Sequence, residues 1–119
     1  MSRIIKFRAW DKEEKKMYHS SSYQFFRDFA DHHIDDVPKQ CELMQYTGLK
    51  DKNGVEIYEG DIMKVPEDVQ KAISEPEIVS VIWERGGFMT SNQRYIWLVA
   101  EYSEIIGNIY ENPEPFNLS

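Results

Sequence analysis

The chain has 119 residues, 41% of them apolar and 13% aromatic, and 14 basic against 21 acidic side chains give it a net charge of −7. This composition excludes a wholly disordered chain and predicts one small domain with a packed core. The longest uncharged apolar runs, residues 78–83 and 95–100, are far shorter than the roughly 20 residues that cross a bilayer. We therefore expect no membrane contact.

Two features indicate the compartment. The first eleven residues include charged side chains at positions 3, 6, 8 and 11, without the apolar stretch of a secretory signal. The single cysteine, Cys41, excludes an internal disulfide and suits a reducing environment. We expect a soluble protein in a reducing cytoplasm.

The basic residues are concentrated near the N-terminus. Residues 1–27 hold seven basic and three acidic side chains, a net charge of +4, so the other residues carry −11. A basic end on an acidic body can bind nucleic acid or the acidic body of a second copy. We favour a homo-oligomer, because an acidic body repels phosphate.

The N-terminal region, residues 1–42, reads as a strand and a short helix. Residues 3–10 alternate between two faces, which predicts a half-buried strand. One face holds Ile5, Phe7 and Ala9, and the other holds Lys6, Arg8 and Trp10. A polar turn leads to a short return strand at residues 17–19, and apolar residues at helical spacing predict a helix over 22–33.

From residue 43 onward, short apolar runs alternate with glycines. Residues 43–47 and 55–58 flank Asn53 and Gly54, which supply the positive-φ positions of a hairpin turn. A bend at Gly60 and Asp61 precedes a strand over 62–65, and Asp61 is expected to accept a hydrogen bond in that bend.

The rest of this region reads as one helix and four strands. Pro66 and two acids predict a helix near 66–74 that Pro76 ends. The predicted strands are residues 78–84, 88–90, 95–100 and 105–110. We therefore predict an α+β, mostly β fold in one domain spanning 1–119, in which residues 43–119 form a small, partly open, SH3-like antiparallel barrel.

Three segments resemble the signature sequences of the YopX family. They are IKFRAWD at residues 5–11, LMQYTGLKDKNGVEIYEGDI at 43–62 and IIGNIYENPE at 105–114. The resemblance implies an accessory protein encoded by a bacteriophage or prophage. It implies no activity and no catalytic residues, because none is established for the family. Residues 66–104 resemble no segment of known role, so any specialisation of this member is expected there.

The tyrosines of these segments allow two interpretations. The bends bring seven residues together as the barrel core, namely Tyr46, Ile57, Tyr58, Ile62, Ile105, Ile109 and Tyr110. Alternatively, Tyr46, Tyr58 and Tyr110 lie on a binding surface, with their rings as contact area. The structural interpretation is the one we favour.

No pattern in the chain predicts catalysis, a metal site or a cofactor. His32 and His33 are adjacent and would diverge on a helix, unlike the i, i+4 pair that binds zinc. None of the six glycines belongs to a phosphate-binding motif. Cys41 has no basic neighbour that would lower its pKa, so we interpret it as a small hydrophobe. We expect a non-enzymatic protein.

The candidate binding residues combine cations with aromatic rings. They are Lys6, Arg8, Trp10, Lys15 and Lys16, with Tyr46 and Tyr58 as further contacts. Such a surface binds either a neighbouring acidic subunit or the bases of a nucleic acid. Our first hypothesis is a module that self-assembles and also engages a host or phage protein. The alternative is a nucleic-acid-binding accessory factor that uses the N-terminal strand.

Overall fold

The structure is a computed structural model that describes residues 6–19 and 40–112. It divides into two compact units, Met1–Gln45 and Tyr46–Ser119, and each is described by itself. Within the described ranges, no helix combines the length and the hydropathy needed to span a membrane.

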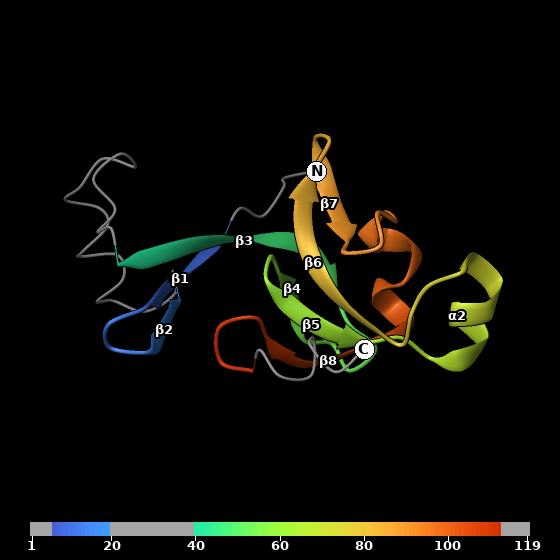
Figure 1. Cartoon of the computed structure of the whole chain (residues 1–119), viewed down its shortest axis with the longest axis horizontal. Helices are drawn as coiled ribbons and strands as arrows, with labels where there is room; N and C mark the ends of the chain where they lie inside the picture. Colours follow the sequence, from blue (N-terminus) through green and yellow to red (C-terminus); the bar gives the residue numbers. More distant parts are fainter. Residues whose placement is uncertain (1–5, 20–39, 113–119) are drawn as a thin grey trace. The chain divides into compact units, whose positions relative to one another are not determined.

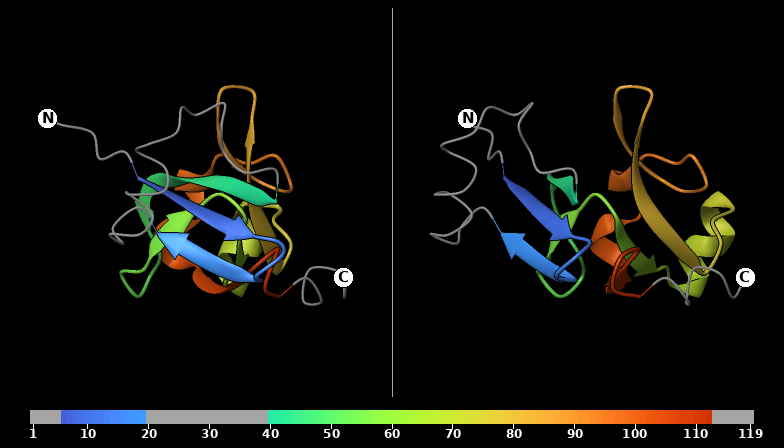
Figure 2. Two further views of the ribbon diagram at one scale, coloured as in Figure 1. Left: turned by 90° about the vertical axis from the view of Figure 1, so that its left-hand side faces the viewer. Right: turned by 60° about the vertical axis from the view of Figure 1, so that its left-hand side comes forward.

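The first unit is built on three antiparallel strands. Strand β1 (Phe7–Asp11) pairs with β2 (Lys16–His19) and with the first half of β3 (Cys41–Lys50) (Figure 2). The Asp11 carboxylate accepts the N–H groups of Glu13 and Glu14 at 2.9 Å, which closes the β1–β2 turn. The predicted return strand is confirmed, whereas the helix predicted over 22–33 lies outside the described residues.

The expectation that β1 is half-buried is wrong. Ala9 is fully buried, but Arg8 and Trp10 on the other face are only 7% and 8% exposed. The alternating pattern predicted the strand correctly, yet both of its faces are covered. The aliphatic stem of arginine and the indole ring tolerate such burial, since each carries a large apolar portion.

The second unit contains a four-stranded antiparallel sheet in the order β7-β6-β5-β8 (Figure 1). Its strands are β5 (Asp61–Lys64), β6 (Ile78–Glu84), β7 (Gly87–Thr90) and β8 (Glu104–Asn108). The second half of β3 pairs with β4 (Glu56–Tyr58). The described parts of the chain are thus mostly β, as predicted.

Helix α2 (Glu67–Ile73) connects β5 and β6 and confirms the helix predicted near 66–74. Pro66 stands at its N-cap rather than inside its first turn, and Glu67 and Asp68 occupy the first turn. The helix ends at Ser74, whose left-handed conformation (φ +56°) terminates it two residues before Pro76.

The predicted β3–β4 hairpin is confirmed, but its turn differs in detail. Only Gly54 adopts a positive φ (+80°), while Asn53 does not. The turn is closed by Asp51 instead, whose Oδ1 accepts the N–H groups of Asn53 at 2.8 Å and Val55 at 2.9 Å. A buried carboxylate therefore replaces the second positive-φ residue as the device that closes the turn.

The strand predicted over residues 95–100 is wrong. The segment forms two 3-10 helices, η2 (Ile96–Leu98) and η3 (Ala100–Tyr102). Ile96, Val99 and Ala100 are buried at i, i+3 and i+4, which is the spacing of one helical face. An uncharged apolar run fits a buried strand or a buried helical turn equally well, so packing decided between them.

The core of the second unit joins strands and the 3-10 segment. It consists of Ile57, Met63, Val65, Val79, Val81, Ile96, Val99 and Ala100. Ile57 and Ile62 were predicted to be buried and are fully buried. Ile109 was also predicted to be buried, but it follows the end of β8 and is exposed. The backbone turns after Asn108, whose Oδ1 accepts the N–H groups of Tyr110 and Glu111.

Candidate interaction surface

The predicted basic and aromatic residues of the first unit do not share one exposed face. Lys15 and Lys16 are exposed in and after the β1–β2 turn, and the Lys16 ammonium lies 5.2 Å from the centroid of the Tyr18 ring. Lys6 is half-buried, and Arg8 and Trp10 are buried. Their binding role stays a prediction, but the indole and guanidinium offer little surface to a ligand.

Tyr46 and Tyr58 form a buried pair. They face each other across the β3–β4 ladder, with ring centroids 5.5 Å apart and planes tilted by 40°. Both side chains are almost fully buried, which supports the structural interpretation of these rings. Asp61 is also structural, because its Oδ2 accepts the Tyr58 N–H at 2.8 Å in the predicted bend.

The surroundings of Cys41 disfavour its thiolate form. Burial raises the pKa of the Cys41 thiol, and the nearby Asp11 carboxylate raises it further. A raised pKa lowers the thiolate fraction at neutral pH, so Cys41 is a poor nucleophile. Within residues 6–19 and 40–112, no three His, Cys, Asp or Glu side chains are grouped as metal ligands; His32 and His33 lie outside these ranges.

The β6–β7 hairpin carries an aromatic pair that the sequence analysis did not single out, and one member of it, Trp83, is exposed. Trp83 faces Phe88 across the ladder, and their rings make an edge-to-face contact with centroids 4.8 Å apart. Trp83 lies on the same face of β6 as the buried Val79 and Val81, yet it is 51% exposed. The reason is that β5 pairs only with Ile78–Ser80, so the hairpin extends beyond it (Figure 1).

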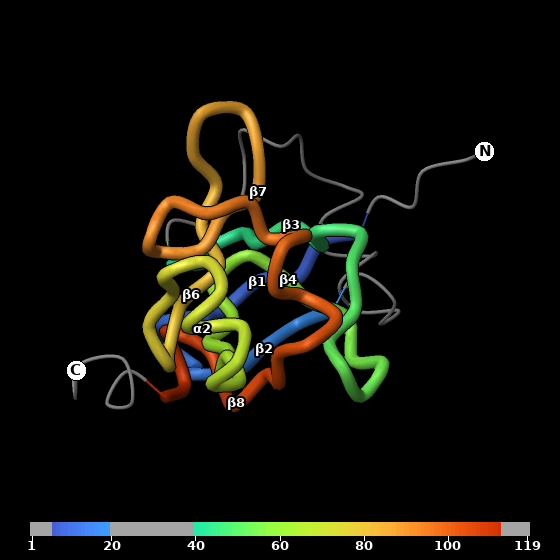
Figure 3. The backbone as a smooth tube through the Cα atoms, turned by 90° about the vertical axis from the view of Figure 1, so that its right-hand side faces the viewer, coloured from blue at the N-terminus to red at the C-terminus, as the bar shows by residue number. Residues whose placement is uncertain are grey.

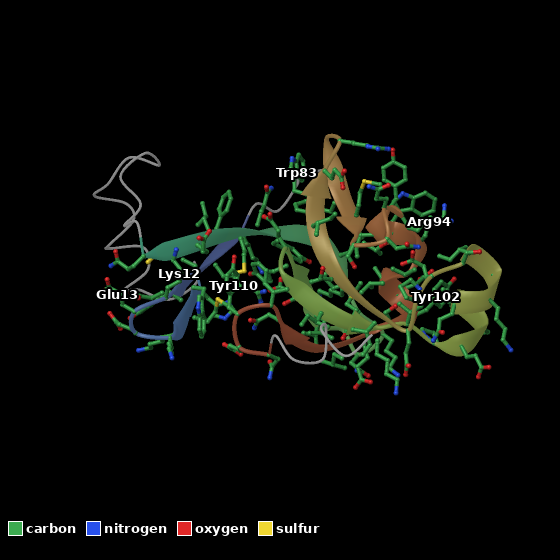
Figure 4. The ribbon with its side chains drawn as sticks, viewed as in Figure 1. Lys12, Glu13, Trp83, Arg94, Tyr102 and Tyr110 are labelled. Carbon is green, nitrogen blue, oxygen red and sulfur yellow. The ribbon has the colours of Figure 1, made fainter. Side chains whose placement is uncertain are left out.

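The segment that follows β7 turns back beside it, and Tyr95 forms an isolated antiparallel bridge with Met89 (Figure 3). Arg85 and Gly86 form the hairpin turn, both with positive φ, and the Tyr95 ring lies 3.8 Å from the position of a Cβ on Gly87. Because Gly87 and Phe88 are consecutive in a strand, Tyr95 and Phe88 lie on opposite faces. Figure 4 shows Trp83 and Arg94 on opposite sides of the hairpin.

The segment after β7 also carries a cation and two exposed rings. Arg94 is exposed, Tyr95 is 53% exposed and Trp97, in η2, is 63% exposed. Residues 85–100 contain no aspartate or glutamate. Two signals in the sequence could have revealed this surface: the absence of acids from this stretch, and the helical spacing of the apolar residues around Trp97.

Comparison with known proteins identifies a matching family model and a similar solved structure. The sequence model of the YopX family, described as YopX protein, matches residues 6–116. The crystal structure of protein EF1440 from Enterococcus faecalis is 30% identical, with a TM-score of 0.66, and the match covers 96% of this chain and 99% of that chain. No curated protein matches this chain.

Proposed function

This chain belongs to the YopX family, and from that premise we propose that it is a phage or prophage accessory protein that acts by binding rather than by catalysis. Its place of action is the cytoplasm of the bacterial host. The single cysteine and its raised pKa support both the reducing compartment and the non-enzymatic role. The scaffold of the second unit is proposed to be a partly open SH3-like barrel, which its short antiparallel strands support.

The observation that carries the proposal is the exposed Trp83 ring, which packs on the half-buried Phe88. A half-exposed indole leaves about 100 Å² of ring surface in water, because aromatic side chains bury about 150–250 Å² when fully covered. Covering that surface is worth about 2–3 kcal/mol. Tryptophan is also the residue type most often found at the energetic centre of protein interfaces.

The proposed occupant of this face is a second copy of the chain. The edge of β6 next to Trp83 supports this choice, since Gly60 donates its N–H to the Val81 carbonyl at 2.8 Å and β5 does not extend further along β6. Exposed strand edges are usually paired or covered in native proteins. Two hairpins related by a twofold axis would cover each other's Trp83 and edge. A host or phage protein is the other candidate occupant.

Sedimentation equilibrium over a range of protein concentrations tests the proposal. Wild-type protein should self-associate, and Trp83→Ser should weaken the association by about 30-fold or more, the equivalent of about 2 kcal/mol. Tyr102→Ser is the matched control, because Tyr102 is similarly exposed (52%) but lies outside the hairpin. A strictly monomeric wild type at about 100 μM, far above typical dissociation constants of stable dimers, would refute self-assembly. An equal effect of both variants would refute the role of this face.

A further inference from the structure

Both arginines of the second unit lie in its longest stretch without an acidic residue, residues 85–100. Residues 46–119 hold six basic and thirteen acidic side chains, a net charge of −7. Residues 85–100 carry Arg85, Arg94 and no acid, a charge of +2, so the other residues of the unit carry −9. This stretch is therefore where the unit attracts an anion.

Neither arginine of the unit is held in a close ion pair. Three of its four lysines, Lys52, Lys64 and Lys71, pair with glutamates at 3.8, 3.8 and 3.1 Å. Among the described residues, Arg94 has no carboxylate within ion-pair distance, and Arg85 reaches its neighbour Glu84 only at 4.0 Å. Both guanidinium groups can thus bind an anion without first breaking a strong ion pair.

Two exposed rings lie beside these arginines. Tyr95 covers Gly87, which adjoins the turn that contains Arg85, and Trp97 is two residues further along the chain. We call Arg85, Arg94, Tyr95 and Trp97 the arginine–aromatic cluster. Its Tyr95 ring lies on the face of the hairpin opposite to Phe88, and Arg94 lies on the other side of the hairpin from Trp83 (Figure 4), so these two residues are separate from the surface of the proposed function.

The backbone that carries the cluster is held in place. Thr90 and Arg94 exchange two hydrogen bonds, from the Thr90 N–H to the Arg94 carbonyl at 2.7 Å and from the Arg94 N–H to Thr90 Oγ1 at 3.2 Å. Ile96 is buried in the core between the two exposed rings. The cost of ordering the segment is therefore already met before a ligand binds.

The cluster combines exposed rings with cations. Exposed fractions of 53% and 63% leave about 200–300 Å² on the two rings together. Two rings with two guanidinium groups match one or two nucleotides, since bases stack on aromatic faces and arginine binds phosphate.

We propose that the arginine–aromatic cluster binds single-stranded nucleic acid, with Tyr95 and Trp97 stacking on bases and Arg85 and Arg94 contacting phosphates. The acidic remainder of the unit limits the contact to these two cations. Two phosphate contacts to a single strand correspond to a slope of about −1.4 for the logarithm of the association constant against the logarithm of salt concentration. The inference differs from the N-terminal site predicted from the sequence, where Arg8 and Trp10 are buried.

Fluorescence anisotropy with labelled oligonucleotides of about 12 nucleotides, dT and rU in separate arms, tests the inference at about 50 mM salt, where phosphate contacts are strong. We expect binding of at least one oligonucleotide. Trp97→Ala should weaken it at least about 5-fold, the lower end of the effect of one stacking ring. Arg94→Gln should weaken it too and reduce the salt slope to about −0.7. Comparing the two arms distinguishes DNA from RNA as the source of the strand.

Trp83→Ser is the matched control, because it removes an exposed indole from the opposite face. It should leave oligonucleotide binding unchanged while it weakens self-association. Absence of binding by the wild type at about 50 mM salt, or equal losses in Trp97→Ala and Trp83→Ser, would overturn the inference. It would also be overturned if Arg94→Gln changed self-association and not oligonucleotide binding, since the cluster would then contact protein.

Discussion

Asp51 connects two parts of the second unit that are far apart in the sequence, and its replacement is expected to destabilise the fold. Its Oδ1 accepts the N–H groups of Asn53 and Val55, and its Oδ2 accepts the N–H of Ile105 at 3.0 Å. The side chain is buried. One carboxylate therefore closes the β3–β4 turn and holds the start of β8, 54 residues later.

The expected magnitude of Asp51→Asn follows from these three hydrogen bonds. The asparagine carbonyl can still accept from Asn53 and Val55, but its NH₂ group then faces the Ile105 N–H, and two donors oppose each other. A hydrogen bond to a charged group contributes about 1.5–3 kcal/mol, and an unpaired buried donor adds a further cost. We expect the free energy of unfolding to fall by about 2–4 kcal/mol at pH 7.

The same carboxylate predicts a pH dependence. Burial by itself would raise the pKa of Asp51, but the N–H groups of Ile105, Val55 and Asn53, with the Lys52 charge, lower it overall. A lowered pKa in the folded state means that the stabilisation is complete above the unfolded-state pKa of about 3.9. This stabilisation is lost as the pH falls through the folded-state pKa. The protonated carboxyl group then carries an O–H donor that faces the Ile105 N–H, so two donors oppose each other.

Urea unfolding of wild-type protein and Asp51→Asn between about pH 7 and pH 3 measures both effects. The difference in the free energy of unfolding between the two proteins should be largest at pH 7 and should become smaller below about pH 4. Asp68→Asn is the control, since Asp68 is exposed in the first turn of α2 and should contribute under about 1 kcal/mol. A loss in Asp51→Asn no larger than in the control, or one that is independent of pH, would refute the reasoning.

Three further predictions concern single positions. A Cβ at Gly107 would lie 2.6 Å from Asn112 Oδ1 and 2.9 Å from its Cβ, so Gly107→Ala should lower the free energy of unfolding by about 1–3 kcal/mol in urea titrations; an unchanged midpoint would show that this turn adapts freely. Arg85 adopts φ +54° in a two-residue hairpin turn that favours Asn-Gly, so Arg85→Asn should raise the thermal midpoint, with a gain of about 0.4–1 kcal/mol; a lower midpoint would contradict it. Burial and then Asp11 raise the pKa of Cys41, so iodoacetamide should alkylate it more slowly at pH 8 in the folded protein than in urea. Asp11→Asn should make the alkylation rates of the folded and unfolded protein more similar. Equal rates in both states of the wild type would count against the raised pKa.

Much of the secondary structure could be predicted from local sequence patterns. The alternation before Asp11 predicts β1, Gly54 marks the β3–β4 turn, and Pro66 with its two following acids predicts α2. Each of these signals depends on backbone conformations that a few neighbouring residues prefer or forbid. The return strand β2 and the hairpin strands β6 and β7 were predictable for the same reason.

The candidate surfaces depended on contacts that local patterns do not contain. Trp83 lies on the same face of β6 as the buried Val79 and Val81. It is exposed only because β5 pairs with β6 no further than Ser80. Arg8 and Trp10 alternate like the exposed residues of an edge strand, yet both are buried.

By itself, the sequence determined the family, the mostly β class and the positions of most strands and turns, because these depend on short-range preferences and on motifs that are contiguous in the chain. Only the tertiary structure decided that residues 96–102 are helical, that Asp51 reaches Ile105, and which rings are exposed. The physical reason is that the period of a pattern is set by the chain's own geometry, whereas the burial of each face is set by residues that fold against it from distant positions.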